Sequence, residues 1–293
     1  MTSETGAIHD IGYRRYDGPR LGPTYIGRSL FVHSLRGAFG IGRSARSKVM
    51  PLLLLAVMTV PALIMAAVVI ITGADELPLE YTRYPVSLQV VVTIFVAAQA
   101  PQSVSRDLRF RVVSLYFSRP LSRHAYVQAK FLAMTVALLV LIAAPLIVLY
   151  AGALLAELSF WDNTRDVAVG LAGAVMFAVV LAGLGLVIAA FTPRRGLGVA
   201  AVVAVLLVLA GVAGTVQGIA TEEQRDDVAG WAGLISPFTL VDGVQSWVLG
   251  AEPSTVEGPP GATGGVVFLS VAVLLVAACY GLLLLRYRRV SAA

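Results

Sequence analysis

Charged residues are scarce in this sequence. Asp, Glu, Lys and Arg make up 13% of its 293 residues, whereas a soluble domain usually carries about 25%. Hydrophobic residues account for 58% of the chain, and the mean hydropathy is +0.83. Because Cys279 is the only cysteine, an internal disulfide is excluded. The polar and basic residues 1–45 contain no short apolar core, so no cleavable signal peptide is expected. This composition indicates an integral membrane protein.

The apolar runs lack ionisable side chains near their middle. Carriers that are driven by an ion gradient commonly bind the ion with such groups at membrane depth. Membrane-embedded enzymes need acids, metal ligands or activated nucleophiles at that depth. Both classes are therefore disfavoured.

Metal and nucleotide motifs are also missing. The three histidines have no metal-ligand spacing; they are His9, His33 and His124. A phosphate-binding loop ends in Lys-Ser or Lys-Thr, but Lys48 precedes Val49 and Lys130 precedes Phe131. We expect no metal site, no cofactor and no ATP site in this chain, and no enzyme activity of its own.

Long apolar runs are what the sequence does contain. A helix needs about 20 apolar residues to cross a bilayer core of roughly 30 Å. The runs are continuous and do not alternate, so a membrane-spanning sheet is not expected. We predict an all-α integral membrane protein whose six transmembrane helices cover about 50–72, 86–104, 127–152, 167–191, 197–218 and 264–285.

The basic residues predict the orientation, because Lys and Arg gather in cytoplasmic loops. With the N-terminus inside, all of the 22 basic residues lie inside except Arg83, Arg165 and Arg225. We therefore predict a multi-pass plasma (inner) membrane protein with both termini cytoplasmic. Residues 1–48 would be a cytoplasmic N-terminal region, and residues 49–293 the six-span domain. Twenty arginines against two lysines favour a bacterial source.

The segment 24–47 before the first run predicts an interfacial helix. At 100° per residue, four of its arginines fall within an arc of about 80°, with Ile26, Leu30 and Ile41 roughly opposite. These arginines are Arg28, Arg36, Arg43 and Arg46. The alternative is an irregular basic tail.

A cationic segment follows the second run. RDLRFRVVSLYFSRPLSRHAYVQAK covers 106–130, and its Phe110, Val113 and Phe117 share one face of a helix. Pro120 would end that helix, because its ring interrupts the hydrogen-bond ladder. Such a helix could contact a protein partner. The alternative is a basic loop that only fixes the topology.

Polar side chains are concentrated in the inner half of the second run. They are Thr93, Gln99 and Gln102. In a dimer they could line a path, or they could simply lie at the inner interface. Gly214 and Gly218 have the GxxxG spacing of close helix contacts, which we interpret as packing.

Two segments resemble motifs of ABC-2-type permeases, the membrane subunits of bacterial ABC exporters. SRDLRFRVVSLYFSRPLSRHAYVQAK (105–130) resembles the pattern (E/D)R-x-x-G-T-L-x-L-L-x-(S/T)-R-P-V-S-R, with Arg111-Val112 in place of Gly-Thr. SPFTLVDGVQSWVLG (236–250) resembles S-P-L-T-x-x-V-D-A-L-R-x-x-x-L-G, with Gln245 in place of Arg. The resemblance covers roughly residues 20–290.

The resemblance implies a role for each segment. Residues 104–124 would form a coupling helix that docks on a separate ATPase subunit, and 24–47 an interfacial elbow. Residues 234–250 would form short outer helices before the last span, with Pro237, Asp242 and Trp247 in them. The coupling residues would be Arg106, Asp107, Arg109, Phe110, Val113, Leu115, Phe117, Ser118, Arg119, Pro120 and Arg123.

The expected function is therefore that of the permease subunit of an ATP-driven exporter. Its partners would be an ABC ATPase that binds ATP and Mg²⁺, a second permease subunit and membrane lipid, with no nucleic acid. The alternatives are a motor-independent channel or secondary carrier, a membrane-embedded enzyme, and a non-transporting membrane anchor for a cytosolic complex. The sequence does not indicate the cargo, or whether the dimer has two identical chains.

Overall fold

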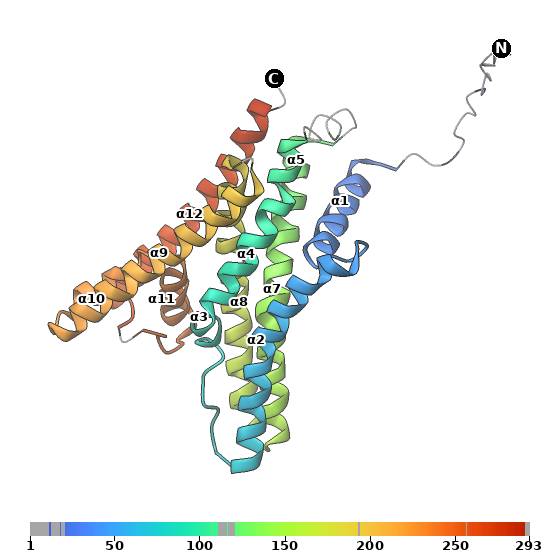
Figure 1. Ribbon diagram of the computed structural model, residues 1–293. Helices are drawn as coiled ribbons and strands as arrows, with labels where there is room; N and C mark the ends of the chain where they lie inside the picture. Colours follow the sequence, from blue (N-terminus) through green and yellow to red (C-terminus); the bar gives the residue numbers. More distant parts are fainter. Residues whose placement is uncertain are drawn as a thin grey trace.

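The computed structural model describes residues 12, 18, 21–110, 116, 121–192, 194–255 and 257–290, and their regular secondary structure is entirely helical (Figure 1). Five of the described helices are long and apolar enough to cross a membrane. They are α2 (Ala45–Thr72), α7 (Arg123–Leu155), α8 (Phe160–Phe191), α9 (Arg195–Glu222) and α12 (Gly261–Val290). The all-helical class is thus confirmed, and five of the six predicted runs form helices that are long and apolar enough to span a membrane.

The segment 86–104 does not form the single long helix that we predicted. A short helix α3 (Tyr84–Ser87) ends at Leu88, whose φ of −106° and ψ of 25° interrupt the helix. The helix α4 (Gln89–Ser103) then has 15 residues, or about 22 Å at 1.5 Å per residue. The chain returns from the end of α2 through the irregular segment 73–83, followed by α3 and α4 (Figure 1).

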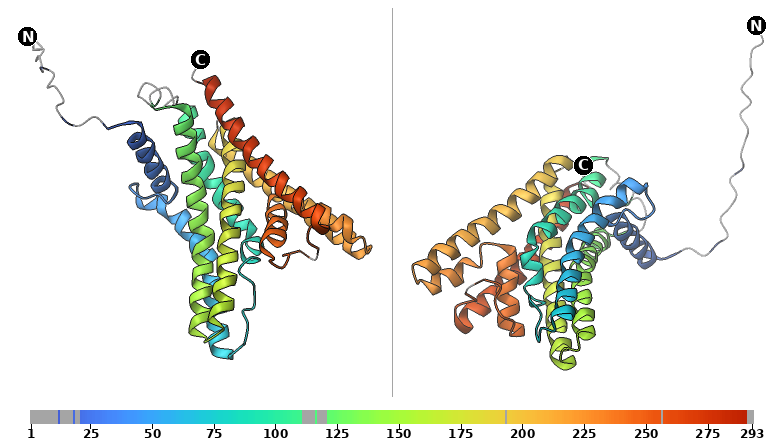
Figure 2. Two further views of the ribbon diagram at one scale, coloured as in Figure 1. Left: turned by 180° about the vertical axis from the view of Figure 1, so that it is seen from behind. Right: turned by 60° about the horizontal axis from the view of Figure 1, so that its bottom comes forward.

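The helices α7 and α8 form the centre of the bundle, with α2 and α4 packed against them, while α9 and α12 diverge from it (Figures 1 and 2). Both central helices have fully buried apolar residues, such as Leu141 on α7 and Phe177 on α8. Gly152 lets α7 approach α2 closely, since a Cβ at this position would overlap Ala66. Most buried apolar residues form one large core. A second, smaller core lies between α11 (Pro237–Leu249) and α12, and consists of Leu240, Val244, Phe268 and Ala272.

The N-terminal helix α1 (Pro23–Ala38) is shorter than the predicted 24–47. The chain turns at Gly40 and Gly42, whose φ values are +67° and +83°. Gly40 is also tightly packed, because a Cβ there would overlap the backbone carbonyl of Ser47. Glycine adopts this left-handed conformation without steric cost, so α2 starts at Ala45 in a new direction, just before the expected domain boundary at residue 48.

Two short helices lie between α9 and α12: α10 (Asp226–Ala232) and α11 (Pro237–Leu249). Ser236 caps α11 by accepting a hydrogen bond from the backbone of Phe238, and Gly250 ends it in a left-handed conformation. Most of α11 is buried against α8 and α12. The expected helical structure in 234–250 is therefore present.

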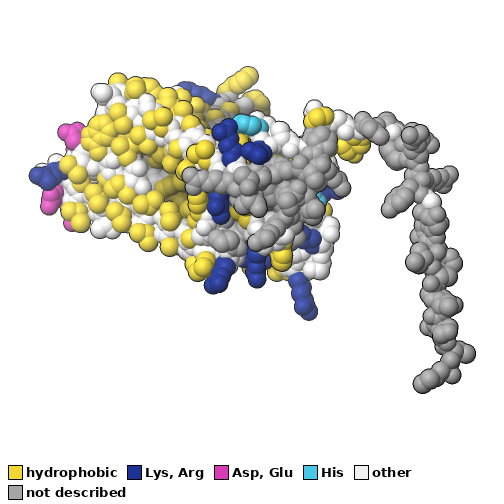
Figure 3. Space-filling view, turned by 90° about the horizontal axis from the view of Figure 1, so that it is seen from above, with side chains coloured by type: hydrophobic (Ala, Val, Ile, Leu, Met, Phe, Trp, Pro, Cys, Tyr) yellow, Lys and Arg dark blue, Asp and Glu magenta, His cyan; other side chains and the backbone are white. Residues whose placement is uncertain are grey.

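The two ends of the bundle differ in charge. We call the end that holds α1, the beginning of α7 and the end of α12 the basic end. Viewed onto that end, Lys and Arg side chains gather over the bundle, whereas acidic side chains show only at one distant edge (Figure 3). Among the described side chains, Asp107 is the one acid at the basic end, and the other acids lie toward the opposite end. This asymmetry agrees with the charge distribution that the sequence shows.

Candidate functional site

A buried ion pair lies at the basic end, where the cationic segment begins. The short helix α5 (Ser105–Arg109) carries Asp107, whose Oδ2 is 2.9 Å from the Nζ of Lys130 on α7. Tyr126 donates its hydroxyl hydrogen to the same Oδ2 at 2.8 Å. Lys130 also donates to the backbone carbonyl of Ser103 at 2.9 Å. We call Ser103, Asp107, Tyr126 and Lys130 the Asp107 cluster.

The Asp107 cluster ties three helices together. The Lys130 and Asp107 side chains are only 9% and 17% exposed, and removal of one partner from a buried pair leaves an uncompensated charge. The ring of Tyr126 packs edge-on against Tyr287 of α12, with centroids 4.9 Å apart. The Nζ of Lys130 also lies 5.7 Å from the centre of the Tyr126 ring. The beginning of the cationic segment is thereby fastened to α7 and α12.

The prediction from the sequence does not include this role of Lys130 and Tyr126. It uses Lys130 only as one of the basic residues that indicate the cytoplasmic side. The available signal was a single lysine one to two turns inside a helix that is otherwise apolar for more than 20 residues. A charge in that position needs a partner. Asp107 is the nearest acid in the sequence.

A cavity of about 430 Å³ lies beside the Asp107 cluster, between α1, α4, α5 and α7. Gln99 and Gln102 line it, together with His33, Asp107 and Lys130. Gln102 also donates a hydrogen bond to the backbone carbonyl of Gly37 at 3.2 Å. Thr93, the third expected polar residue of this helix, is fully buried away from the cavity. The structure thus brings together two of the three side chains.

The four arginines expected on one interfacial helix occupy three different elements. Arg28 and Arg36 lie on α1, Arg43 lies in the turn, and Arg46 lies in the first turn of α2. The predicted common arc is therefore wrong, because the glycine turn ends α1 before Arg43. Arg28, Arg36 and Arg46 are exposed.

The described part of the expected coupling segment is exposed where it leaves α5. Phe110 is 65% exposed, and the guanidinium of Arg109 lies 5.8 Å from the centre of its ring. Arg123 is exposed at the start of α7. The remaining predicted positions lie outside the described residues: Val113, Leu115, Phe117, Ser118, Arg119, Pro120 and the side chain of Arg106.

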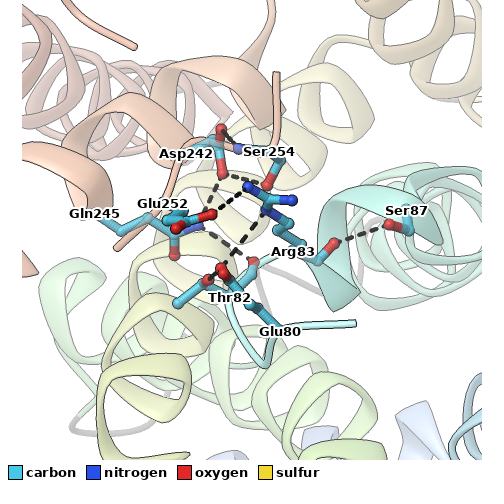
Figure 4. Close-up of polar contacts among 8 residues, drawn as sticks. All are labelled: Glu80, Thr82, Arg83, Ser87, Asp242, Gln245, Glu252 and Ser254. Atoms are coloured by element: carbon cyan, nitrogen blue, oxygen red, sulfur yellow. Dashed lines mark hydrogen bonds and ion pairs between the residues drawn. The ribbon is translucent and has the colours of Figure 1, made fainter. Parts of the chain in front are cut away.

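A second polar cluster lies near α3 and α11 (Figure 4). Asp242 on α11 is 2% exposed and accepts hydrogen bonds from the backbone and the hydroxyl of Ser254, at 2.8 and 2.6 Å. Gln245 donates to Asp242 at 3.0 Å and to the backbone carbonyl of Thr82 at 3.3 Å. Burial raises the pKa of Asp242 above its ordinary value, although these hydrogen bonds and the charge of Arg83 oppose the rise.

Arg83 is the positively charged residue next to Asp242 and Gln245. It forms ion pairs with Glu252 at 2.9 Å and with Glu80 at 3.6 Å (Figure 4). An acidic cavity of about 570 Å³ lies next to it, with Asp75, Asp162 and Asp166 among its lining residues. The cluster holds the loop before α12, the segment before α3 and α11 together.

Pro237 and Trp247, the other two residues expected on the outer helices, both lie on α11. Pro237 is buried in the first turn of α11. Trp247 is 40% exposed, and its ring covers Gly265 so closely that a Cβ there would overlap it. Trp247 therefore helps to place α11 against α12.

Comparison with known proteins agrees with these features. A search of curated proteins returned no match. The family model described as ABC-2 family transporter protein matches residues 79–286. This range contains α3 to α11, most of α12, the Asp107 cluster and the second polar cluster, around Asp242. Membership of this family implies, in general, an ABC ATPase as partner. The chain, a multi-pass helical protein, belongs to the ABC-2 transporter family.

Proposed function

We propose that this chain is the membrane-spanning permease subunit of an ATP-driven exporter, and that its ATPase partner docks at the basic end. The observation that carries the proposal is the Asp107 cluster, which fastens the start of the cationic segment to the bundle. A motor that pulls on this segment would therefore pull on α7 and α12. Export as the direction rests on family analogy.

The exposed side chains beside the cluster suit a docking surface. Phe110 and Arg109 project from the end of α5, and Arg123 lies where the chain enters α7. Aromatic and arginine side chains are enriched in protein interfaces. On this proposal ATP and Mg²⁺ bind to the partner, the basic end is cytoplasmic, and α1 lies at the inner membrane surface as an elbow.

A second permease subunit would complete the translocation path, and α9 is the best-supported contact. It has the smallest buried share of the five long helices. Apart from the backbone of α9 itself, no described residue lies within 4 Å of a Cβ built at Gly211, Gly214 or Gly218. The GxxxG spacing of Gly214 and Gly218 therefore makes no packing contact among the described residues. Small residues allow close contact between transmembrane helices. We propose that a partner permease packs there.

Co-purification from native membranes tests the proposal. A tagged chain should retain a stoichiometric soluble ATPase, and ATP should change the distance between spin labels on the two permease subunits. Lys130→Met should retain the ATPase but lose most of this ATP-dependent change, because the ion pair between Asp107 and α7 is lost and only the hydrogen bond from Tyr126 remains. Lys48→Met, which alters the only other lysine, is the matched control. Intact dimeric chain without any ATPase would refute the proposal.

A further inference from the structure

An apolar groove of about 680 Å³ runs along the outside of the bundle. Its walls come from α7, α8 and α12, and Val241 and Val244 of α11 also line it. Because three of these elements are membrane-spanning helices, the medium around the groove is the hydrocarbon of the bilayer. An occupant must therefore be apolar over most of its length.

The dimensions of the groove fit one leaflet. Along α12 its lining residues extend from Leu269 to Tyr280, which is about 16 Å at 1.5 Å per residue. The hydrocarbon core is roughly 30 Å thick, so this length is about half of it. An acyl chain of a phospholipid has about the same length.

The polar groups along the groove lie toward the basic end only. Gln128 on α7 and Tyr280 on α12 line it there. His124 precedes Gln128 by one turn on the same face of α7, and Arg288 lies on the face of α12 that carries Ala277. Both His124 and Arg288 are exposed. This arrangement offers hydrogen-bond donors and a positive charge where a phosphate would lie.

We propose that the groove binds one acyl chain of an anionic phospholipid from the leaflet at the basic end. The phosphate of that lipid lies near Gln128, His124, Tyr280 and Arg288. The apolar groove supplies affinity through burial of methylene groups, and the charge at its end selects an anionic headgroup. The proposal does not depend on which cargo the transporter moves.

Native mass spectrometry of the intact complex tests the proposal. With phosphatidylglycerol and phosphatidylcholine added in equal amounts, we expect one tightly held phosphatidylglycerol per chain. Ala277→Phe should weaken that binding about tenfold, since loss of about two buried methylene groups changes a binding constant by that factor. Ala278→Phe is the control, because Ala278 is exposed and does not line the groove. Arg288→Gln should remove the preference for phosphatidylglycerol.

Fluorescence provides a second measurement that does not need Ala277→Phe to fold. A tryptophan at groove residue Leu132 should be quenched by one equivalent of brominated phosphatidylglycerol in detergent, and a tryptophan at exposed Val140, outside the groove, should not. Equal quenching at both positions would overturn the proposal. The proposal would also be overturned if the protein bound both lipids equally. It would likewise be overturned if Ala277→Phe lost the dimer but kept the lipid.

Discussion

Lys130 on α7 and Asp107 on α5 form an ion pair of 2.9 Å in which both side chains are largely buried. Tyr126 shares the same carboxylate oxygen, and Lys130 also bonds the carbonyl of Ser103. A buried pair of this kind seldom adds much stability by itself, but it is costly to break. It therefore holds the start of the cationic segment in one position relative to the bundle.

Lys130→Met should lower the free energy of unfolding by about 3–5 kcal/mol, because Asp107 would remain buried without its partner. Thermal unfolding of the detergent-solubilised protein measures the change. Lys48→Met should have little effect, since Lys48 is exposed at the start of α2. Asp107→Leu in the Lys130→Met background should recover part of the loss. Equal stability of the two lysine variants would contradict the pair.

Gly152→Ala should destabilise the protein by about 1–3 kcal/mol, because the added methyl group overlaps Ala66 and forces α7 and α2 apart. Gly214→Ala is the matched control, since no other described residue, apart from the backbone of its own helix, lies within 4 Å of its Cβ position. We expect unchanged monomer stability for Gly214→Ala and, from the proposed contact through α9, a smaller dimer fraction. Unfolding curves and light scattering measure the two effects. Equal destabilisation by both substitutions would count against the described packing.

Asp242 should give the stability a pH dependence of known sign. Burial raises its pKa in the folded state above the ordinary value, so the folded protein binds a proton more readily than the unfolded chain does. This contribution to stability is complete below the ordinary pKa and is lost as the pH rises through the raised pKa. The unfolding temperature of the wild type minus that of Asp242→Asn should therefore be larger at pH 4 than at pH 8. A difference that grows with pH would mean that the hydrogen bonds from Ser254 and Gln245 outweigh burial.

Labelling of single cysteines should report the orientation of the bundle. In a Cys279→Ser background, Arg123→Cys and Asp162→Cys place thiols at exposed positions of the basic end and the opposite end. A maleimide that cannot cross membranes should label Asp162→Cys in intact cells, and should label Arg123→Cys only after the membrane is opened. The reverse pattern would show that the basic end faces outward.

The sequence was sufficient for the long helices but not for the break before α4. The five long apolar helices are continuous apolar runs in the sequence, and the hydrophobic effect makes such runs identifiable without tertiary information. Residues 84–104 are also largely apolar, and hydrophobicity alone does not mark the interruption at Leu88 that separates α3 from α4. The turn after α1 was predictable in principle, because Gly37, Gly40 and Gly42 follow one another closely.

The candidate site shows a similar division. Composition and spacing pointed to the cationic segment, since a cluster of arginines between apolar runs is a local feature. The partners of Asp107 could not be assigned in that way, because Tyr126 and Lys130 lie about 20 residues further along the chain and meet it only when α7 packs beside α5. Gln245 stands where the family pattern has Arg. The sequence did not indicate that Arg83, from a distant segment, would supply the positive charge near Asp242 instead.

The shortness of α4 has an electrical consequence. The segment 73–83, which leads to α3, is irregular backbone beside an acidic cavity of about 570 Å³, and such backbone at membrane depth requires protein or water around it. Water in that cavity would carry the potential of the solution at the opposite, acidic end of the bundle inward to α3. The transmembrane voltage would then fall mainly across α4, over about 22 Å instead of about 30 Å, and any charge beside α4 would experience a correspondingly steeper field.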